Sequence, residues 1–176
     1  MRLAYLRVEC FRNLQSLRLS SLDEQSCVFL IGENGQGKTN ILESIYLLCF
    51  GGSFRTRQDI DLIYNGEQEA IISGSFRSTV RNSENWMERE VTLRLRTDQP
   101  KEIRIDGSHV GDRGELVGSI PCILFSHDDL RAVDGPPSQL RRFFDQTAAL
   151  SDPTSLPAQR HYRRVLHERN ALLRSA

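Results

Sequence analysis

The sequence predicts an α/β fold, and residues 27–49 carry most of that prediction. Residues 27–31 are consecutive apolar residues, which is typical of a fully buried strand. Residues 32–39 are rich in glycine, and residues 39–49 repeat apolar side chains at helical spacing. A strand, a glycine-rich loop and a helix in this order are typical of a nucleotide-binding α/β domain. The residues expected to form the buried stripe of the helix are Ile41, Leu42, Ile45, Leu48 and Cys49.

The loop matches the phosphate-binding pattern G-x-x-x-x-G-K-[ST] at every fixed position. Its residues are Gly32, Glu33, Asn34, Gly35, Gln36, Gly37, Lys38 and Thr39. Glycines let backbone N–H groups converge on phosphate oxygens, and the helix N-terminus adds its positive dipole end. We expect Lys38 to reach the β- and γ-phosphates of ATP, and the hydroxyl of Thr39 to bind Mg²⁺. The alternative is a glycine-rich turn before an ordinary helix, which the matching flanks disfavour.

Further strands are predicted on both sides of this central stretch. Residues 3–12 alternate roughly between apolar and charged side chains, and residues 17–19 indicate a second, short strand. Within residues 67–110 the apolar period is again two, in three segments separated by polar turns. These segments predict an antiparallel β subdomain with one face exposed to solvent.

The C-terminal part is predicted to be mainly helical after one more strand. Residues 121–125 read as a second buried strand, and a break at residues 135–137 follows. Ser138 is expected to cap one helix, and a last amphipathic helix is still running where the sequence stops. We therefore assign residues 1–135 to a nucleotide-binding lobe and residues 136–176 to the start of a helical lobe.

Composition places the chain among ordinary globular proteins of 176 residues, with 39% hydrophobic and 26% charged residues. The net charge is zero, but residues 138–176 hold seven arginines against three carboxylates, so this segment is basic. Four cysteines without a C-x-x-C pair in apolar surroundings predict buried, reduced thiols in the cytoplasm. No signal peptide and no membrane-spanning apolar run are visible, so we expect no membrane association.

Several segments in the same order resemble the RecF family, whose ATPase heads belong with the SMC and ABC types. The matching segments are residues 6–13, 32–45, 53–56, 123–130, 141–145 and 167–173. The resemblance implies lobe I of an ABC/SMC-type P-loop ATPase head, with the antiparallel β subdomain and the start of a helical lobe. The chain then looks like the N-terminal portion of a RecF-type protein.

The resemblance also implies a function in recombinational DNA repair, replication restart and the SOS response. The cofactors would be ATP and Mg²⁺, and the DNA would be a junction of single and double strands. RecR and RecO would be partners in the cytoplasm, and the full-length protein would form an ATP-dependent homodimer.

Additional site residues follow from the resemblance. Arg12 and Asn13 resemble the strand end beside the nucleotide in SMC-type heads, and Asn40 directly follows the loop. Arg55 resembles the arginine that couples DNA contact to the phosphates, and Arg57 shares its basic segment. A structural role for Arg12 and an uncommitted basic loop around Arg55 are the alternatives.

The chain departs from the family pattern in its catalytic motifs. Residues 123–130 match the Q-loop region, where His127 and Asp128 stand for the usual Pro-Glu. Asp128 is therefore a candidate Mg²⁺ ligand together with Thr39. Neither a signature motif nor a Walker B strand is found, so no complete catalytic set is expected and the chain alone should not hydrolyse ATP. A transporter nucleotide-binding subunit and a non-hydrolysing interaction fragment are the alternative functions.

Overall fold

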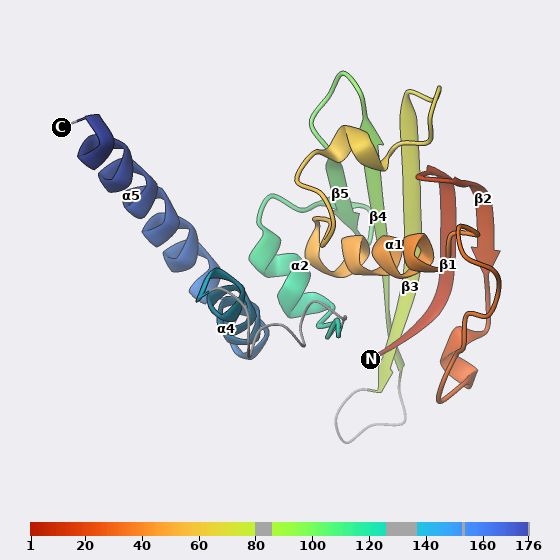
Figure 1. Cartoon of the computed structure of the whole chain (residues 1–176). Coiled ribbons are helices and arrows are strands. Elements are labelled where there is room, and N and C mark those ends of the chain that lie inside the picture. Colours follow the sequence, from red (N-terminus) through yellow and green to blue (C-terminus); the bar gives the residue numbers. More distant parts are fainter. Residues whose placement is uncertain (80–85, 126–136, 153, 176) are drawn as a thin grey trace. The chain divides into compact units, whose positions relative to one another are not determined.

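The computed structural model describes residues 1–79, 86–125, 137–152 and 154–175 (Figure 1). The chain divides into two compact units, Met1–Gly111 and Asp112–Ala176, and each is described by itself. The boundary predicted between residues 135 and 136 lies outside the described residues.

The first unit is built on one six-stranded antiparallel sheet with the strand order β2-β1-β3-β4-β5-β6. The strands are β1 (Arg2–Phe11), β2 (Leu14–Leu19), β3 (Glu69–Thr79), β4 (Trp86–Arg96), β5 (Glu102–Ile105) and β6 (Ser108–His109). The alternation in the sequence predicted all of these except β6, which only closes the turn after β5. Because β1 pairs with β3, the strands predicted as a β subdomain continue the N-terminal hairpin in a single sheet.

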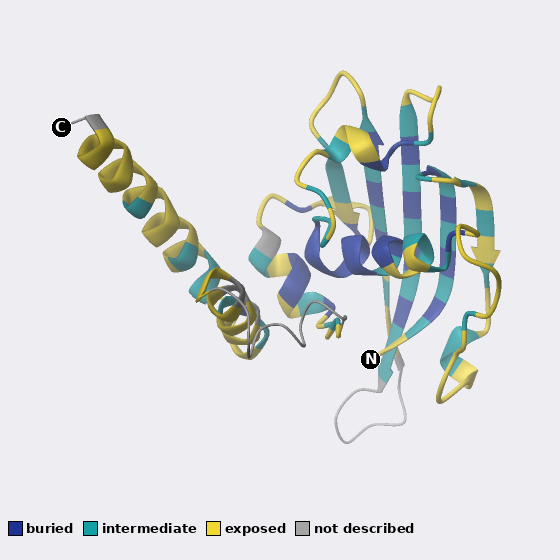
Figure 2. Cartoon of the chain, in the orientation of Figure 1, coloured by how far each residue is buried: buried dark blue, intermediate teal, exposed yellow. Residues whose placement is uncertain are grey.

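The helix after the glycine-rich loop, α1 (Lys38–Phe50), packs against the apolar face of this sheet (Figures 1 and 2). Buried side chains alternate along the central strands, as in Leu6 and Val8 of β1. Gly74 of β3 permits the close approach, since a Cβ there would lie 2.8 Å from Cδ1 of Leu48. The sheet therefore positions α1, and with it the loop that precedes the helix.

The buried face of α1 differs in part from the predicted stripe. Leu48 and Cys49 are buried as expected, but Leu42 is 49% exposed, and Ile41 and Ile45 are half-buried. The residues of α1 that are buried are Glu43, Ser44, Tyr46, Leu47, Leu48, Cys49 and Phe50. The prediction assumed a purely apolar stripe, whereas the face that meets the antiparallel sheet includes a carboxylate.

Both segments predicted as buried strands were predicted wrongly. Residues 27–31 and 121–125 form no strand; Phe29 is 79% exposed, Ile31 92% and Phe125 74%. A buried strand needs neighbours that pair with its backbone, and within the described residues every ladder belongs to the antiparallel sheet. For the same reason Cys27 is exposed, and of the four cysteines only Cys49 is buried.

The second unit contains three helices in the described residues: α2 (Arg113–Ser119), α4 (Pro137–Ser151) and α5 (Ser155–Ser175). The sequence predicted α4 and α5 but not α2, which Asp112 caps by accepting a hydrogen bond from Gly114 N at 2.8 Å. Short 3₁₀ turns in the first unit complete the elements, η1 (Leu22–Glu24) and η2 (Asp59–Leu62). Among the described helices, none has both the length and the apolar character that a membrane span requires.

Candidate nucleotide-binding site

The glycine-rich loop leads directly into α1, and its glycines are required by geometry. Gly37 is the N-cap residue of α1, and its φ is +95°, while Gly35 has a φ of +86°. Both values lie in the left-handed region that a residue with a Cβ rarely adopts. At Gly37 a Cβ would also meet Oδ1 of Asn13 and Cδ2 of Leu14, each at 2.8 Å. The turn between β1 and β2 therefore packs against the loop at this glycine.

Lys38 turns its ammonium group back onto the loop. Its Nζ donates hydrogen bonds to the carbonyl oxygens of Gly32 and Glu33, both at 2.7 Å. Inside the same loop, the side chain of Gln36 accepts a hydrogen bond from Glu33 N at 3.2 Å. Thr39 is exposed on the first turn of α1, next to the lysine. A cation, a hydroxyl and the N-terminal amides of a helix thus share one small region, as an anion site requires.

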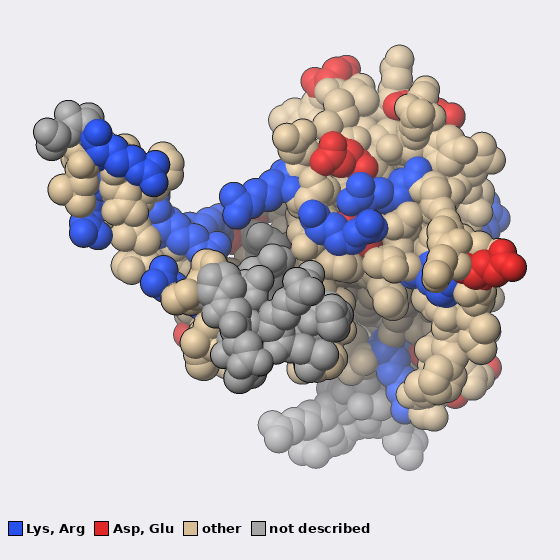
Figure 3. Space-filling model, viewed as in Figure 1, with Lys and Arg blue, Asp and Glu red and all other residues tan. Residues whose placement is uncertain are grey.

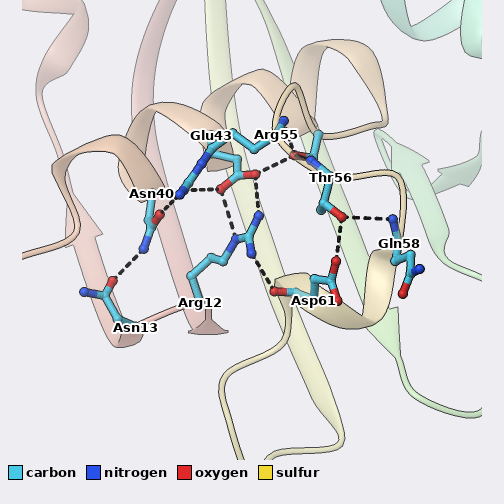
Figure 4. A network of polar contacts seen from close by, with 9 residues as sticks. Arg12, Asn13, Asn40, Glu43, Arg55, Thr56, Gln58 and Asp61 are labelled. Carbon is cyan, nitrogen blue, oxygen red and sulfur yellow. Dashed lines mark hydrogen bonds and ion pairs between the residues drawn. The ribbon is translucent and has the colours of Figure 1, made fainter. Parts of the chain in front are cut away.

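A polar network lies beside this loop and is centred on Glu43 of α1 (Figure 4). The network consists of Arg12, Asn13, Asn40, Glu43, Ser53, Arg55, Thr56, Gln58 and Asp61. The side chain of Glu43 is fully buried, so its charge needs partners. It accepts from Arg12 Nε at 3.1 Å, from Arg12 NH2 at 2.9 Å, from the hydroxyl of Ser53 and from Arg55 NH1 at 3.2 Å.

Arg12 is held in this network at every nitrogen of its guanidinium group. Besides its two bonds to Glu43, it donates from NH1 to the carbonyl oxygen of Asp61 at 2.8 Å. Its backbone has a φ of +54°, and its backbone N–H donates to Leu62 O at 2.8 Å. Such a backbone angle is costly for arginine and persists because these contacts hold it. The structure therefore turns Arg12 toward Glu43, and the hydrogen bonds of its side chain go to Glu43 and Asp61 and not to the loop.

Asn13 and Asn40 connect the loop to the network. Asn13 donates from Nδ2 to Gly35 O at 2.7 Å and accepts from Asn40 Nδ2, also at 2.7 Å. Asn40 in turn accepts from Arg55 NH1 at 2.8 Å. Two of the sequence-predicted residues, one from the turn between β1 and β2 and one from α1, thus bring Arg55 within reach of the loop.

The basic segment after α1 contributes two arginines that differ in exposure and in ion pairing. Arg55 is 45% exposed and pairs with Glu43, whereas Arg57 is exposed and makes no ion pair with any described residue. Figure 3 shows basic side chains gathered over the face of the first unit that carries α1. Asp128, the candidate Mg²⁺ ligand from the Q-loop position, lies outside the described residues.

Three residues that organise the site escaped sequence reasoning: Glu43, Ser53 and Asp61. Ser53 accepts from the backbone N–H groups of Arg55 and Thr56 at 2.9 and 3.1 Å, which shapes the basic segment. The one feature of the sequence that could have predicted this network was Glu43 itself. A carboxylate inside the most apolar helix of the chain needs a cationic partner, and Arg12 and Arg55 were already candidates.

A sequence model described as the RecF/RecN/SMC N terminal domain matches residues 2–128, which is most of the chain. The chain belongs to this family. RecF proteins are its close relatives: one of Chlorobium luteolum is 37% identical over 98% of this chain and 45% of its own length. Another, of Symbiobacterium thermophilum, is 36% identical over 99% of the chain and 44% of its length. The chain thus spans slightly less than half the length of these RecF relatives.

Solved structures support the same relationship. A RecF structure described as RecF-ATP aligns with a TM-score of 0.79 at 27% identity, covering 99% of this chain and 45% of that one. An SMC ATPase structure aligns with a TM-score of 0.64 at 19% identity, over 84% of this chain and 99% of that one, which shows the fold alone. The fold is therefore the predicted α/β P-loop ATPase head, and the resemblance to RecF is confirmed.

Proposed function

We propose that this chain carries the ATP-binding part of a RecF-type ATPase of DNA repair. The observation that carries the proposal is the ammonium group of Lys38 inside a glycine-rich loop at the N-terminus of α1. The loop residues 32–39 then bind the phosphates of ATP through backbone N–H groups, the lysine and the helix dipole. A relative described as RecF-ATP supports this assignment, because it shares the fold over 99% of the chain.

The residues present also fit a Mg²⁺ ion that is bound mainly through the nucleotide. Thr39 offers an exposed hydroxyl beside Lys38, and no cluster of three or more His, Cys, Asp or Glu that could hold a metal occurs among the described residues. Mg²⁺ in phosphate sites keeps several waters and takes few protein ligands, which agrees with such a sparse donor set. We assign Thr39 as one ligand and keep Asp128 as the candidate second ligand. When bound, the ion neutralises phosphate charge.

The second part of the proposal is DNA binding by the basic segment around Arg55 and Arg57. Arginine contacts to phosphates supply affinity without reading bases, so DNA structure rather than sequence would be recognised. By analogy with its RecF relatives, we propose junctions of single- and double-stranded DNA as the substrate. RecR and RecO as cytoplasmic partners and an ATP-dependent homodimer of the full-length protein complete this proposal.

Hydrolysis by this chain alone is not part of the proposal. Phosphoryl transfer needs groups that orient the attacking water and stabilise the developing charge, and the sequence contains neither the signature motif nor the Walker B strand that would supply them. A transporter subunit is disfavoured, because the curated relatives that match nearly the whole chain are RecF proteins. An interaction fragment that does not bind nucleotide is the competing function.

Calorimetry with ATP and Mg²⁺ tests the proposal, because the chain offers a matched control. Lys38→Ala should weaken binding by about tenfold or more, since a charge-assisted hydrogen bond to phosphate is lost. Lys101→Ala removes the same charge elsewhere, where Lys101 pairs with Asp59 at 3.1 Å, and should leave the affinity unchanged. Equal affinity of the Lys38→Ala variant and the wild type, or no binding at all, would favour the interaction fragment instead.

A further inference from the structure

The hydrogen bonds between the loop and Arg55 form a continuous series, or chain of bonds, in which the order of donors and acceptors is fixed. At one end, the carbonyl oxygen of Gly35 can only accept; at the other, the guanidinium group of Arg55 can only donate. The side-chain amides of Asn13 and Asn40 lie between them, and the bonds are 2.7, 2.7 and 2.8 Å long. Each amide must therefore donate toward Gly35 and accept from the side of Arg55, as Figure 4 shows for the two asparagines.

The chain of bonds ends at Gly35, at a point where the loop has room to move. Gly35 is exposed, and a Cβ built on it would meet nothing within 4 Å. Its carbonyl shares a peptide plane with the N–H of Gln36, which donates to Glu33 O at a long 3.5 Å. A phosphate that draws this N–H away from Glu33 O rotates the whole peptide plane. The rotation turns the Gly35 carbonyl away from Asn13 and removes the acceptor on which the chain of bonds depends.

The other end of the chain can let Arg55 leave at low cost. Arg55 contacts Glu43 with NH1 alone, at 3.2 Å, and its side chain is 45% exposed. Arg12 contacts the same carboxylate with two nitrogens, and Ser53 donates to it as well. Departure of Arg55 therefore leaves the buried charge of Glu43 paired, which is the condition under which a buried carboxylate tolerates losing a partner.

From these three observations we propose that Asn13 and Asn40 are positioning residues that couple the loop to Arg55. With the Gly35 carbonyl in place, the two amides hold Arg55 on Asn40 and Glu43. A nucleotide that rotates the peptide after Gly35 breaks the chain of bonds and releases Arg55 to a phosphate of DNA. The inference rests on the proposed function, since it assigns the residues through which ATP changes DNA affinity.

The measured quantity is the ratio of the DNA dissociation constants without and with nucleotide. The probe is a fluorescent duplex with a single-stranded overhang, titrated by anisotropy with the chain of residues 1–176. Mg²⁺ and a non-hydrolysable ATP analogue are added at a concentration that saturates each variant. A charge change in a variant acts on both constants, and the charge of the nucleotide is the same for every variant, so the difference in this ratio between wild type and variant isolates the coupling from general electrostatics. We expect a ratio of about five for the wild type, the equivalent of one hydrogen bond between uncharged partners.

Two variants interrupt the chain of bonds from different sides. Asn40→Asp still accepts from Arg55 but can no longer donate to Asn13, so Arg55 stays held whether or not nucleotide is present. Asn13→Ala removes the link to Gly35 without adding a charge, and it serves if the first variant is unstable. Both should bring the ratio close to one, while Asn65→Asp, the same change at an exposed turn residue, should keep the ratio of the wild type.

A second readout needs no DNA. The side-chain N–H signals of Arg55, assigned by their loss in Arg55→Ala, should shift when nucleotide is added to the wild type but not to Asn13→Ala. A wild-type ratio of one, or variants that keep the wild-type ratio and the nucleotide-induced shift, would overturn the inference while leaving the proposed function intact. Failure of the wild type to bind nucleotide or DNA would overturn the proposed function, and the inference with it.

Discussion

The stability of the first unit should depend on Arg12 far more than on Arg55, although both contact Glu43. Removing Arg12 takes two hydrogen bonds from a carboxylate that is fully buried, and also the bond to Asp61 O. Breaking a buried ion pair on one side costs about 3–5 kcal/mol, because the remaining charge is left under-compensated. That is a large part of the about 5–15 kcal/mol by which such domains are stable.

Arg55→Ala is the matched comparison. Arg55 supplies one long contact and is half-exposed, so its loss should cost at most about 1 kcal/mol. A third variant tests whether the destabilisation comes from the carboxylate that Arg12→Ala leaves under-compensated. In Arg12→Ala/Glu43→Leu that charge is gone, so the double variant should be more stable than Arg12→Ala alone. Urea unfolding followed by circular dichroism measures all three. If Arg55→Ala costs as much as Arg12→Ala, or the double variant is the least stable, Arg12 is not the principal partner of Glu43.

Three further outcomes are expected. Gly37→Ala should reduce both ATP affinity and stability more than Gly66→Ala: their φ values are +95° and +91°, but only at Gly37 would the new Cβ clash. In DNA titrations at several salt concentrations, Arg57→Ala should lower the slope of log Kd against log salt by about one, while Arg18→Ala in β2 should not. The backbone N–H of Glu90 and the neighbouring Arg89 hold the pKa of Asp106 below its ordinary value. Asp106 therefore stabilises the fold above about pH 4, and this contribution is lost as the pH falls through the lowered pKa. In urea unfolding at several pH values, the free energy of unfolding of Asp106→Asn should fall less on acidification than that of the wild type.

Much of the fold follows from local patterns in the sequence. The period of two in β1, β3 and β4 depends only on one sheet face being buried, so it is visible without knowing the partner strands. The loop was predictable because phosphate binding demands glycines and a lysine at set spacing. The strand predicted at residues 27–31 was wrong for the opposite reason. An apolar run indicates burial, but it forms a strand only where another backbone segment pairs with it.

The polar network could be predicted only in part. Arg12, Asn13, Asn40 and Arg55 were named through the family resemblance, but their common partner Glu43 was not. A single buried carboxylate leaves no periodic signal, and its partners come from the turn after β1 and from the segment after α1. Only the packing of α1 against the sheet shows that these residues meet.

The exposure of residues 27–31 has a practical consequence for work on this chain. This uncharged segment holds three exposed residues of strong β propensity, Val28, Phe29 and Ile31, and a second molecule can add onto it as a strand. Self-association at this place would reach the phosphate-binding loop at once, because Gly32 is the next residue. Nucleotide affinity measured in concentrated samples would then fall with protein concentration, so titrations belong at low concentration with light scattering recorded alongside.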